Sequence, residues 1–190
     1  MREKKTTTEE TPMSKSYNTK NISEWADKLV CGEEILLSGV VYTARDAAHK
    51  RINALLDEGK EIPFDLKDAV IYYAGPTPEK PGMPIGSCGP TTSTRMDVYS
   101  PRFMDLGLKG MVGKGNRSKE VIDAIVRNKG VYLCAIGGAG ALAARCVKKL
   151  EIIAFEDLGC ESVKRLEIEN FPLFVGIDST GRSLFENDKK

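Results

Sequence analysis

Segments with the apolar period of a strand alternate with segments of helical period along most of this chain. A strand-like run at residues 34–43 is followed by a helical face at 44–58. Further along, a helical face at 118–128 is followed by a strand-like run at 131–136. Further strands are expected at 69–74, 110–112, 151–155, 165–169 and 173–177, and further helices at 101–108 and 139–148. This alternation predicts a single layered α/β domain with a mixed sheet.

The start of the chain lacks this pattern. Residues 1–18 are polar and aperiodic, which favours a disordered tail. Asn21 and Glu24 then have the spacing of a capping box and predict a short helix through Trp25. Residues 19–190 are sufficient for one domain with its own apolar core.

The charge is balanced, with 28 lysines and arginines against 27 aspartates and glutamates, a formal net charge of +1. No basic field therefore favours nucleic acid or an acidic membrane as a partner. The apolar runs are too short to span a bilayer, and the polar start has no apolar core of a secretory signal. We expect a cytoplasmic protein.

Five cysteines, at positions 31, 88, 134, 146 and 160, are spread along the chain without a Cys-x-x-Cys pair. The odd number and the spacing argue against disulfides, a structural zinc site and a self-contained iron–sulfur cluster. Cys134 and Cys146 lie in apolar segments and are typical of small core residues. We expect no metal ligand in this chain.

A hydroxyl-rich segment follows a Gly-Pro turn at residues 89–95. It contains Thr91, Thr92, Ser93, Thr94 and Arg95. Hydroxyl and backbone N–H groups donate hydrogen bonds, and a guanidinium can clamp two oxygens, so the segment suits a carboxylate or a phosphate. The alternative is a polar turn with a helix cap.

A second candidate anion site is the Gly-Lys-Gly-Asn-Arg-Ser run at residues 113–118. It precedes a predicted helix, whose N-terminus attracts anions, and Lys114 adds a full charge. It is not a P-loop, because Leu108 stands where the first glycine belongs and Gly115 replaces the Ser or Thr. A surface turn is the alternative.

The third motif, Arg-Asp-Ala-Ala-His at residues 45–49, contains the only histidine of the chain. Arg45 and His49 are four residues apart, so a helix places them on one face. A single histidine on a helix is more often structural or solvated than functional.

A fourth, glycine-rich motif at residues 137–143 matches a dinucleotide fingerprint, with Glu156 near the expected distance. Too little chain follows for further parallel units. The glycines are better explained by close helix–strand packing or by another amide-lined edge of the same anion site.

Taken together, the first three motifs resemble those of the β subunit of the class I fumarase and L-tartrate dehydratase family, which are iron–sulfur hydro-lyases. The matching elements, in order, are residues 45–49, 89–92 with 95–96, 113–118 and 156–159. The resemblance implies a swivelling β/β/α domain. It also implies an α subunit that carries a [4Fe–4S] cluster, an α2β2 assembly, and no cluster ligand in this chain.

The resemblance also implies roles for individual residues in the reversible hydration of fumarate to L-malate. Thr91 would transfer the carbon-bound proton, with His49 as assisting base or substrate ligand. Substrate-binding roles fall to Arg45, Thr92, Arg95, Lys114 and Asn116. L-tartrate is the alternative substrate, since Ser93 and Thr94 offer two hydroxyls, and mesaconate stays open. A non-catalytic dicarboxylate-binding module is the other alternative.

Overall fold

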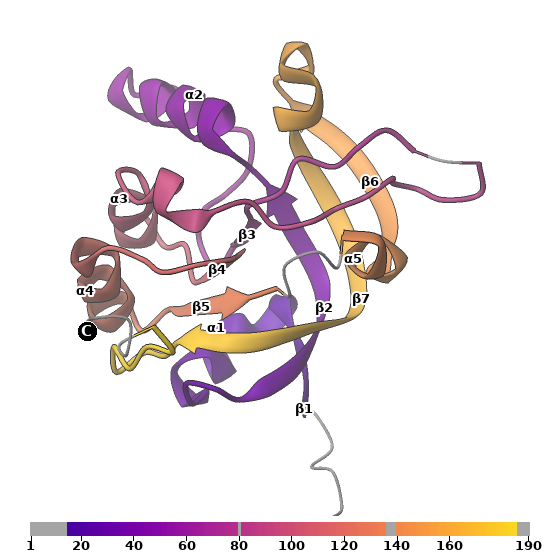
Figure 1. Ribbon diagram of the computed structural model, residues 1–190. Coiled ribbons are helices and arrows are strands. Elements are labelled where there is room, and N and C mark those ends of the chain that lie inside the picture. Colours follow the sequence, from indigo (N-terminus) through magenta and orange to yellow (C-terminus); the bar gives the residue numbers. More distant parts are fainter. Residues whose placement is uncertain (1–14, 80, 136–139, 186–190) are drawn as a thin grey trace, which may run out of the picture.

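The computed structural model describes residues 15–79, 81–135 and 140–185 (Figure 1). The strands in these residues are β1 (Lys15–Asn18), β2 (Glu34–Thr43), β3 (Val70–Tyr72), β4 (Gly110–Gly113), β5 (Val131–Cys134), β6 (Val147–Ala154) and β7 (Val163–Ile177). The α-helices are α1 (Ile22–Trp25), α2 (Asp46–Asp57), α3 (Ser100–Asp105), α4 (Lys119–Asn128) and α5 (Gly140–Cys146). Short 3-10 helices are η1 (Thr19–Asn21), η2 (Ala26–Lys28), η3 (Ser93–Met96) and η4 (Glu156–Glu161).

The strands form one mixed sheet that closes on itself. Neighbours from β1 through β5 are parallel, whereas β7 is antiparallel to β2, β5 and β6. Because β7 pairs with both β2 and β5, the strands β2, β3, β4, β5 and β7 complete a ring. The predicted α/β class and mixed sheet are confirmed.

Two apolar cores lie on the two faces of this ring, since successive residues of a strand point to opposite faces. On β3 and the residue after it, Val70 and Tyr72 join one core, and Ile71 and Tyr73 join the other. The first core also includes residues of α1 and α5, and the second includes residues of α2, α3 and α4.

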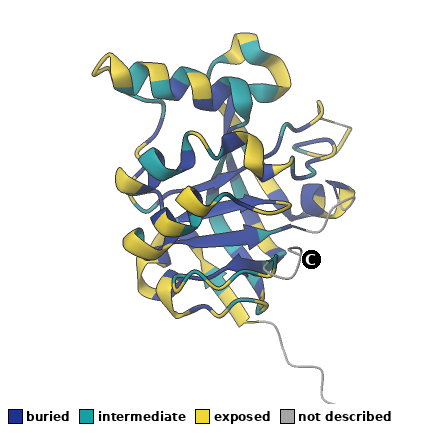
Figure 2. Cartoon of the chain, turned by 60° about the vertical axis from the view of Figure 1, so that its left-hand side comes forward, coloured by how far each residue is buried: buried dark blue, intermediate teal, exposed yellow. Residues whose placement is uncertain are grey.

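Helices α2, α3 and α4 lie along one side of the sheet, and their outer faces are exposed (Figures 1 and 2). In α4, Val121, Ala124 and Ile125 are buried, which is the spacing of one helical face. Ser118 caps this helix by accepting a bond from the N–H of Val121. None of the helices in the described ranges is long and apolar enough to cross a membrane.

The predicted tail extends four residues too far. Lys15–Asn18 form β1, in which Lys15 pairs with Ile35 and Asn18 with Ser38 of β2. Pairing with a neighbouring strand gives this polar segment the backbone partners that its own sequence does not reveal. Residues 1–14 lie outside the described residues.

Other local predictions were wrong in detail, among them the helix predicted at 139–148, which ends at Cys146 because Val147 begins β6. The capping box at Asn21 does not form, because its amide donates to the Glu24 carboxylate (3.1 Å) and makes no bond to the helix backbone. The strands predicted at 165–169 and 173–177 are one strand, β7. The strand continues through Asn170, whose φ is 50°, because the Asn170 N–H donates to Ser38 Oγ (2.9 Å).

Candidate functional site at the strand ends

Three of the sequence motifs meet at the carboxyl ends of neighbouring parallel strands. Arg45 lies two residues beyond β2, and Lys114 directly follows β4. Thr91 is held at the end of β3, between them, because its N–H donates to the Tyr73 carbonyl (2.7 Å). This edge of a parallel sheet is where α/β proteins bind ligands.

The hydroxyl-rich segment and the loop at residues 113–118, here called the lysine loop, are directly paired. Thr92 forms an isolated parallel bridge with Lys114. The Ser93 N–H donates to the Lys114 carbonyl (3.0 Å), and the Lys114 N–H donates to Ser93 Oγ (3.1 Å). The two candidate anion motifs are therefore one site.

Ser93 is a structural member of this pairing and not an exposed donor. Its side chain is buried, and its Oγ also accepts from the Tyr132 hydroxyl (2.8 Å). A Cβ added to Gly113 would lie 2.0 Å from this Oγ, so Gly113 leaves the space that Ser93 fills. The suggestion that Ser93 could recognise the extra hydroxyl of tartrate is therefore wrong, whereas Thr94 is exposed.

Arg95 connects this site to the start of α2. Its Nε donates to Asp46 Oδ1 (2.8 Å), and 49% of the arginine side chain is exposed. The described residues provide no partner for its two Nη groups or for the Lys114 ammonium. Thr92 and Asn116 are exposed too, and Thr91 is half-buried. Asn116 Oδ1 accepts a hydrogen bond from the N–H of Arg117 (2.7 Å). The site is thus an open rim with cationic and hydroxyl groups.

Arg45 lies at the same edge but is more enclosed. Its Nη2 is 3.4 Å from Glu161 Oε1, and 21% of its side chain is exposed. Glu161 ends η4, which also contains residues 156–159, the last element of the sequence resemblance. The start of α2 therefore makes two contacts. Arg45, the residue before the helix, contacts η4, and Asp46 contacts the hydroxyl-rich segment.

Part of the glycine-rich fourth motif also packs here. The Cys88 N–H donates to the Gly140 carbonyl (3.0 Å), and a Cβ added to Gly140 would lie 3.1 Å from the Gly89 nitrogen. Gly140 thus permits the start of α5 to approach the turn before Thr91. This close approach is to a turn and not to the strand that the sequence predicted, and residues 137–139 lie outside the described residues.

His49 does not lie on the open rim. Its side chain is fully buried against Tyr73, Tyr99 and Phe103, and it stacks on Phe103 with ring centroids 5.2 Å apart. Nδ1 is 3.0 Å from the Arg45 carbonyl, which only accepts, so Nδ1 carries the proton. Nε2 is buried and has no partner among the described residues. This placement does not support His49 as a direct substrate ligand.

Burial lowers the pKa of His49 to about 4, and the nearby Arg117 charge acts in the same direction. The Arg45 carbonyl and Asp46 oppose that shift without cancelling it. The imidazole is therefore neutral at pH 7, and it packs among the aromatic residues of the second core.

The pH dependence of stability tests this placement. The folded-state pKa of His49 lies below the unfolded value of 6.5, so its neutral form stabilises the fold fully above about pH 6.5. That contribution decreases as the pH falls toward 4. Between pH 7 and pH 5 we expect a loss of about 2 kcal/mol in the free energy of unfolding.

His49→Phe is the matched variant, since it keeps a ring in an aromatic environment and removes the only histidine. Urea titrations at the two pH values should give a much flatter dependence for the variant. Equal pH dependence in both proteins would assign the effect to carboxylates and contradict a buried, neutral His49.

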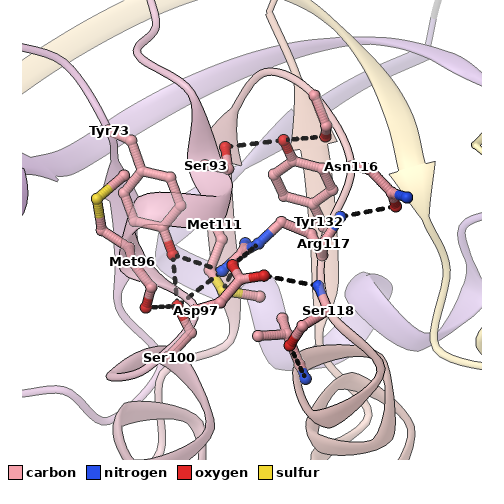
Figure 3. A network of polar contacts seen from close by, with 12 residues as sticks. Tyr73, Ser93, Met96, Asp97, Ser100, Met111, Asn116, Arg117, Ser118 and Tyr132 are labelled. Atoms are coloured by element: carbon pink, nitrogen blue, oxygen red, sulfur yellow. Dashed lines mark hydrogen bonds and ion pairs between the residues drawn. The ribbon is translucent and has the colours of Figure 1, made fainter.

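Sequence reasoning missed a buried arginine that supports the rim. Arg117 has a fully buried side chain, and its Nε donates to Asp97 Oδ1 (2.7 Å) (Figure 3). Its Nη2 donates to Ser100 Oγ (2.7 Å), and the guanidinium lies 5.0 Å from the Tyr132 ring centroid. Burial alone would lower the pKa of Arg117, but Tyr73 and Asp97 raise it.

Asp97 also accepts from the backbone N–H of Ser118 (2.6 Å). One carboxylate therefore joins the segment after η3 to the start of α4 (Figure 3). The sequence signal was a charged residue directly before a helix cap, with an aspartate 20 residues earlier in the chain.

Two of the cysteines have weakly acidic thiols in this fold. Burial raises the pKa of Cys88 to about 12 and that of Cys134 to about 11, so both thiols are protonated at neutral pH. Among the described residues, no three His, Cys, Asp or Glu side chains come together in a way that could hold a metal ion.

The fold and site define an α/β domain that gathers cationic and hydroxyl side chains at the ends of parallel strands. Comparison with known families gives the specific assignment. The chain belongs to the Fumarase C-terminus family, whose model matches residues 1–188. This finding confirms the family indicated by the sequence motifs.

Individual relatives differ in how much of their length this chain covers. Fumarate hydratase 1, mitochondrial, of Leishmania major is 45% identical over 152 residues, which are 79% of this chain and 28% of the relative. Fumarate hydratase class I, anaerobic, of Escherichia coli K12 is 43% identical over 152 residues, again 79% of this chain and 28% of the relative. The putative L(+)-tartrate dehydratase subunit beta of Methanocaldococcus jannaschii is 41% identical over 169 residues, 86% of this chain and 87% of the relative.

Proposed function

We propose that this chain is the β subunit of a hydro-lyase that hydrates fumarate reversibly to L-malate. The observation that carries the proposal is the meeting of Arg45, Arg95, Lys114 and Thr91 at one edge of the parallel strands. A small dianion needs two separated cationic groups, and hydration needs a proton-transfer group between them. The relatives that share this domain bear fumarate hydratase names.

In this proposal the two arginines hold the substrate carboxylates. Asp46 occupies only the Nε edge of Arg95, so the two Nη groups can clamp a carboxylate. Arg45 takes the other carboxylate, and Thr92 and Asn116 add neutral hydrogen bonds. Lys114, beside Thr92, stabilises the negative charge that develops as a proton leaves carbon.

Thr91 is the proposed proton-transfer group. A threonine hydroxyl is a weak base unless its alkoxide is stabilised, and Lys114 and Arg95 are the candidates for that role. His49 is the weaker candidate because it is buried away from the rim. We propose that it acts through its bond to the Arg45 carbonyl.

The rim is open, and no three metal-ligating side chains come together in the described residues, which supports completion of the site by another part of the enzyme. We propose an α subunit that carries a [4Fe–4S] cluster, in an α2β2 assembly in the cytoplasm. The archaeal relative named as a subunit beta has nearly the extent of this chain, which supports a separate partner. The same relative favours L-tartrate as a second candidate substrate.

The chain alone is expected to be inactive. Anaerobic reconstitution with the α subunit, iron and sulfide should produce hydration of fumarate, followed as loss of its ultraviolet absorbance. Activity on L-tartrate alone would select the second substrate, and no activity on fumarate, mesaconate or tartrate would refute a hydro-lyase. Tight calorimetric binding of L-malate by the isolated chain, with no activity in the pair, would favour a binding module.

A further inference from the structure

The Arg45 guanidinium is bounded on two sides, by a carboxylate and by a glycine. Its Nη2 is 3.4 Å from Glu161 Oε1, and the two side chains are 21% and 23% exposed. A Cβ added to Gly75 would lie 2.8 Å from Nη1 and 3.1 Å from Cδ of Arg45. Gly75 therefore allows the guanidinium to lie directly against the backbone that follows β3.

Glu161 is itself fixed by a second bond. Its Oε2 accepts from the backbone N–H of Ala47 (3.0 Å), in the first turn of α2. That N–H has no partner within the helix, and a negative charge is favourable at a helix N-terminus. A single carboxylate thus joins the start of α2 to the side chain of Arg45.

Polar contacts hold the segment that carries Glu161. No residue of η4 is buried. The buried Lys164 ammonium lies 3.1 Å from the Gly159 carbonyl, 3.2 Å from the Cys160 carbonyl and 2.7 Å from Ser162 Oγ. On the other side, Arg51 of α2 holds Asp157 with two bonds of 2.8 Å.

We propose that Glu161 is a positioning residue that holds the Arg45 guanidinium in place for a substrate carboxylate. The proposal rests on the proposed function, in which Arg45 binds one end of the dicarboxylate. Arg45 Nε is buried without a partner, so among the described residues the Glu161 carboxylate is the only polar partner of this guanidinium. Without that charge, the guanidinium is free to leave its position beside Gly75.

Glu161→Gln tests this in the reconstituted complex. The variant keeps an oxygen for the Ala47 N–H but loses the charge that holds Arg45. We expect the KM for fumarate to rise about five- to tenfold, with kcat changed less than about twofold, because a pre-positioned binding group is lost. Asp157→Asn removes the other carboxylate between η4 and α2 and should change neither constant.

Gly75→Ala approaches the same guanidinium from the other side. The new methyl group meets the flexible end of Arg45, so the side chain moves and the fold is retained. We expect a similar rise in KM at an unchanged thermal midpoint. If Glu161 only stabilised the fold, Glu161→Gln and Gly75→Ala would not share this increase in KM.

Hydrogen exchange of the Arg45 Nε–H, measured by NMR on the full chain, gives a readout without activity. Exchange should be faster in Glu161→Gln than in the wild type or Asp157→Asn. Unchanged exchange in Glu161→Gln, or an equal KM increase in Asp157→Asn, would overturn the positioning role. If exchange is faster in Glu161→Gln but the wild-type complex is inactive, the proposed hydro-lyase function is refuted and the positioning of Arg45 by Glu161 is retained.

Discussion

Replacement of Arg95 by lysine should lower kcat/KM for fumarate roughly 10- to 100-fold, the loss expected for charge-assisted bonds worth about 1.5–3 kcal/mol. Lysine keeps the charge and can still pair with Asp46, but it loses the planar pair of Nη donors that suits a carboxylate. Because the side chain is half-exposed, unfolding free energy should change by less than about 0.5 kcal/mol. Steady-state kinetics of the reconstituted complex and urea titration measure the two effects.

Arg127→Lys is the matched control for this experiment. Arg127 is 48% exposed, nearly the same as Arg95, and it forms two bonds to Asp105 between α4 and α3. The control should retain wild-type turnover, since this pair lies on helices and not at the strand ends. Equal turnover in the two variants would remove Arg95 from the substrate site.

Much of the local structure follows from apolar periodicity alone. The strand predicted at 34–43 has those bounds in β2, and the helix predicted at 118–128 lacks only its cap residue, Ser118. The closure of the ring could not be predicted in this way. It depends on pairing of β7 with two strands that are distant in sequence, and Asn170 interrupts the β7 pattern with a positive φ.

The convergence of the site motifs was predictable because each follows a strand, and parallel strands end at one edge. The position of His49 was not. Four-residue spacing correctly places it on the Arg45 side of α2, but Ala48 and Ile52 show that this side enters the core. Arg45, which lies directly before the first helical residue, is only half-buried. The burial of Arg117 was signalled only by its place before a helix cap and by Asp97 20 residues earlier, which alone do not predict a buried charge.

Loss of the countercharge of Arg117 should destabilise the fold more than any of the substitutions above. Asp97→Asn leaves the fully buried guanidinium without its countercharge and weakens the bond to the Ser118 N–H. Removing one partner of a buried pair costs about 3–5 kcal/mol, because the other charge stays desolvated. We expect a loss of that size in the free energy of unfolding, measured by urea titration of the full chain.

Two comparisons separate this buried pair from an ordinary surface contact. Asp157→Asn breaks the exposed pair with Arg51 and should cost less than about 1 kcal/mol. The double variant Asp97→Asn with Arg117→Met removes both buried charges, so it should be less destabilised than the sum of the single variants. Additive losses would mean that Asp97 acts through the Ser118 N–H and not through Arg117. The Asp97–Arg117 ion pair would then not be what holds the segment after η3 against the start of α4.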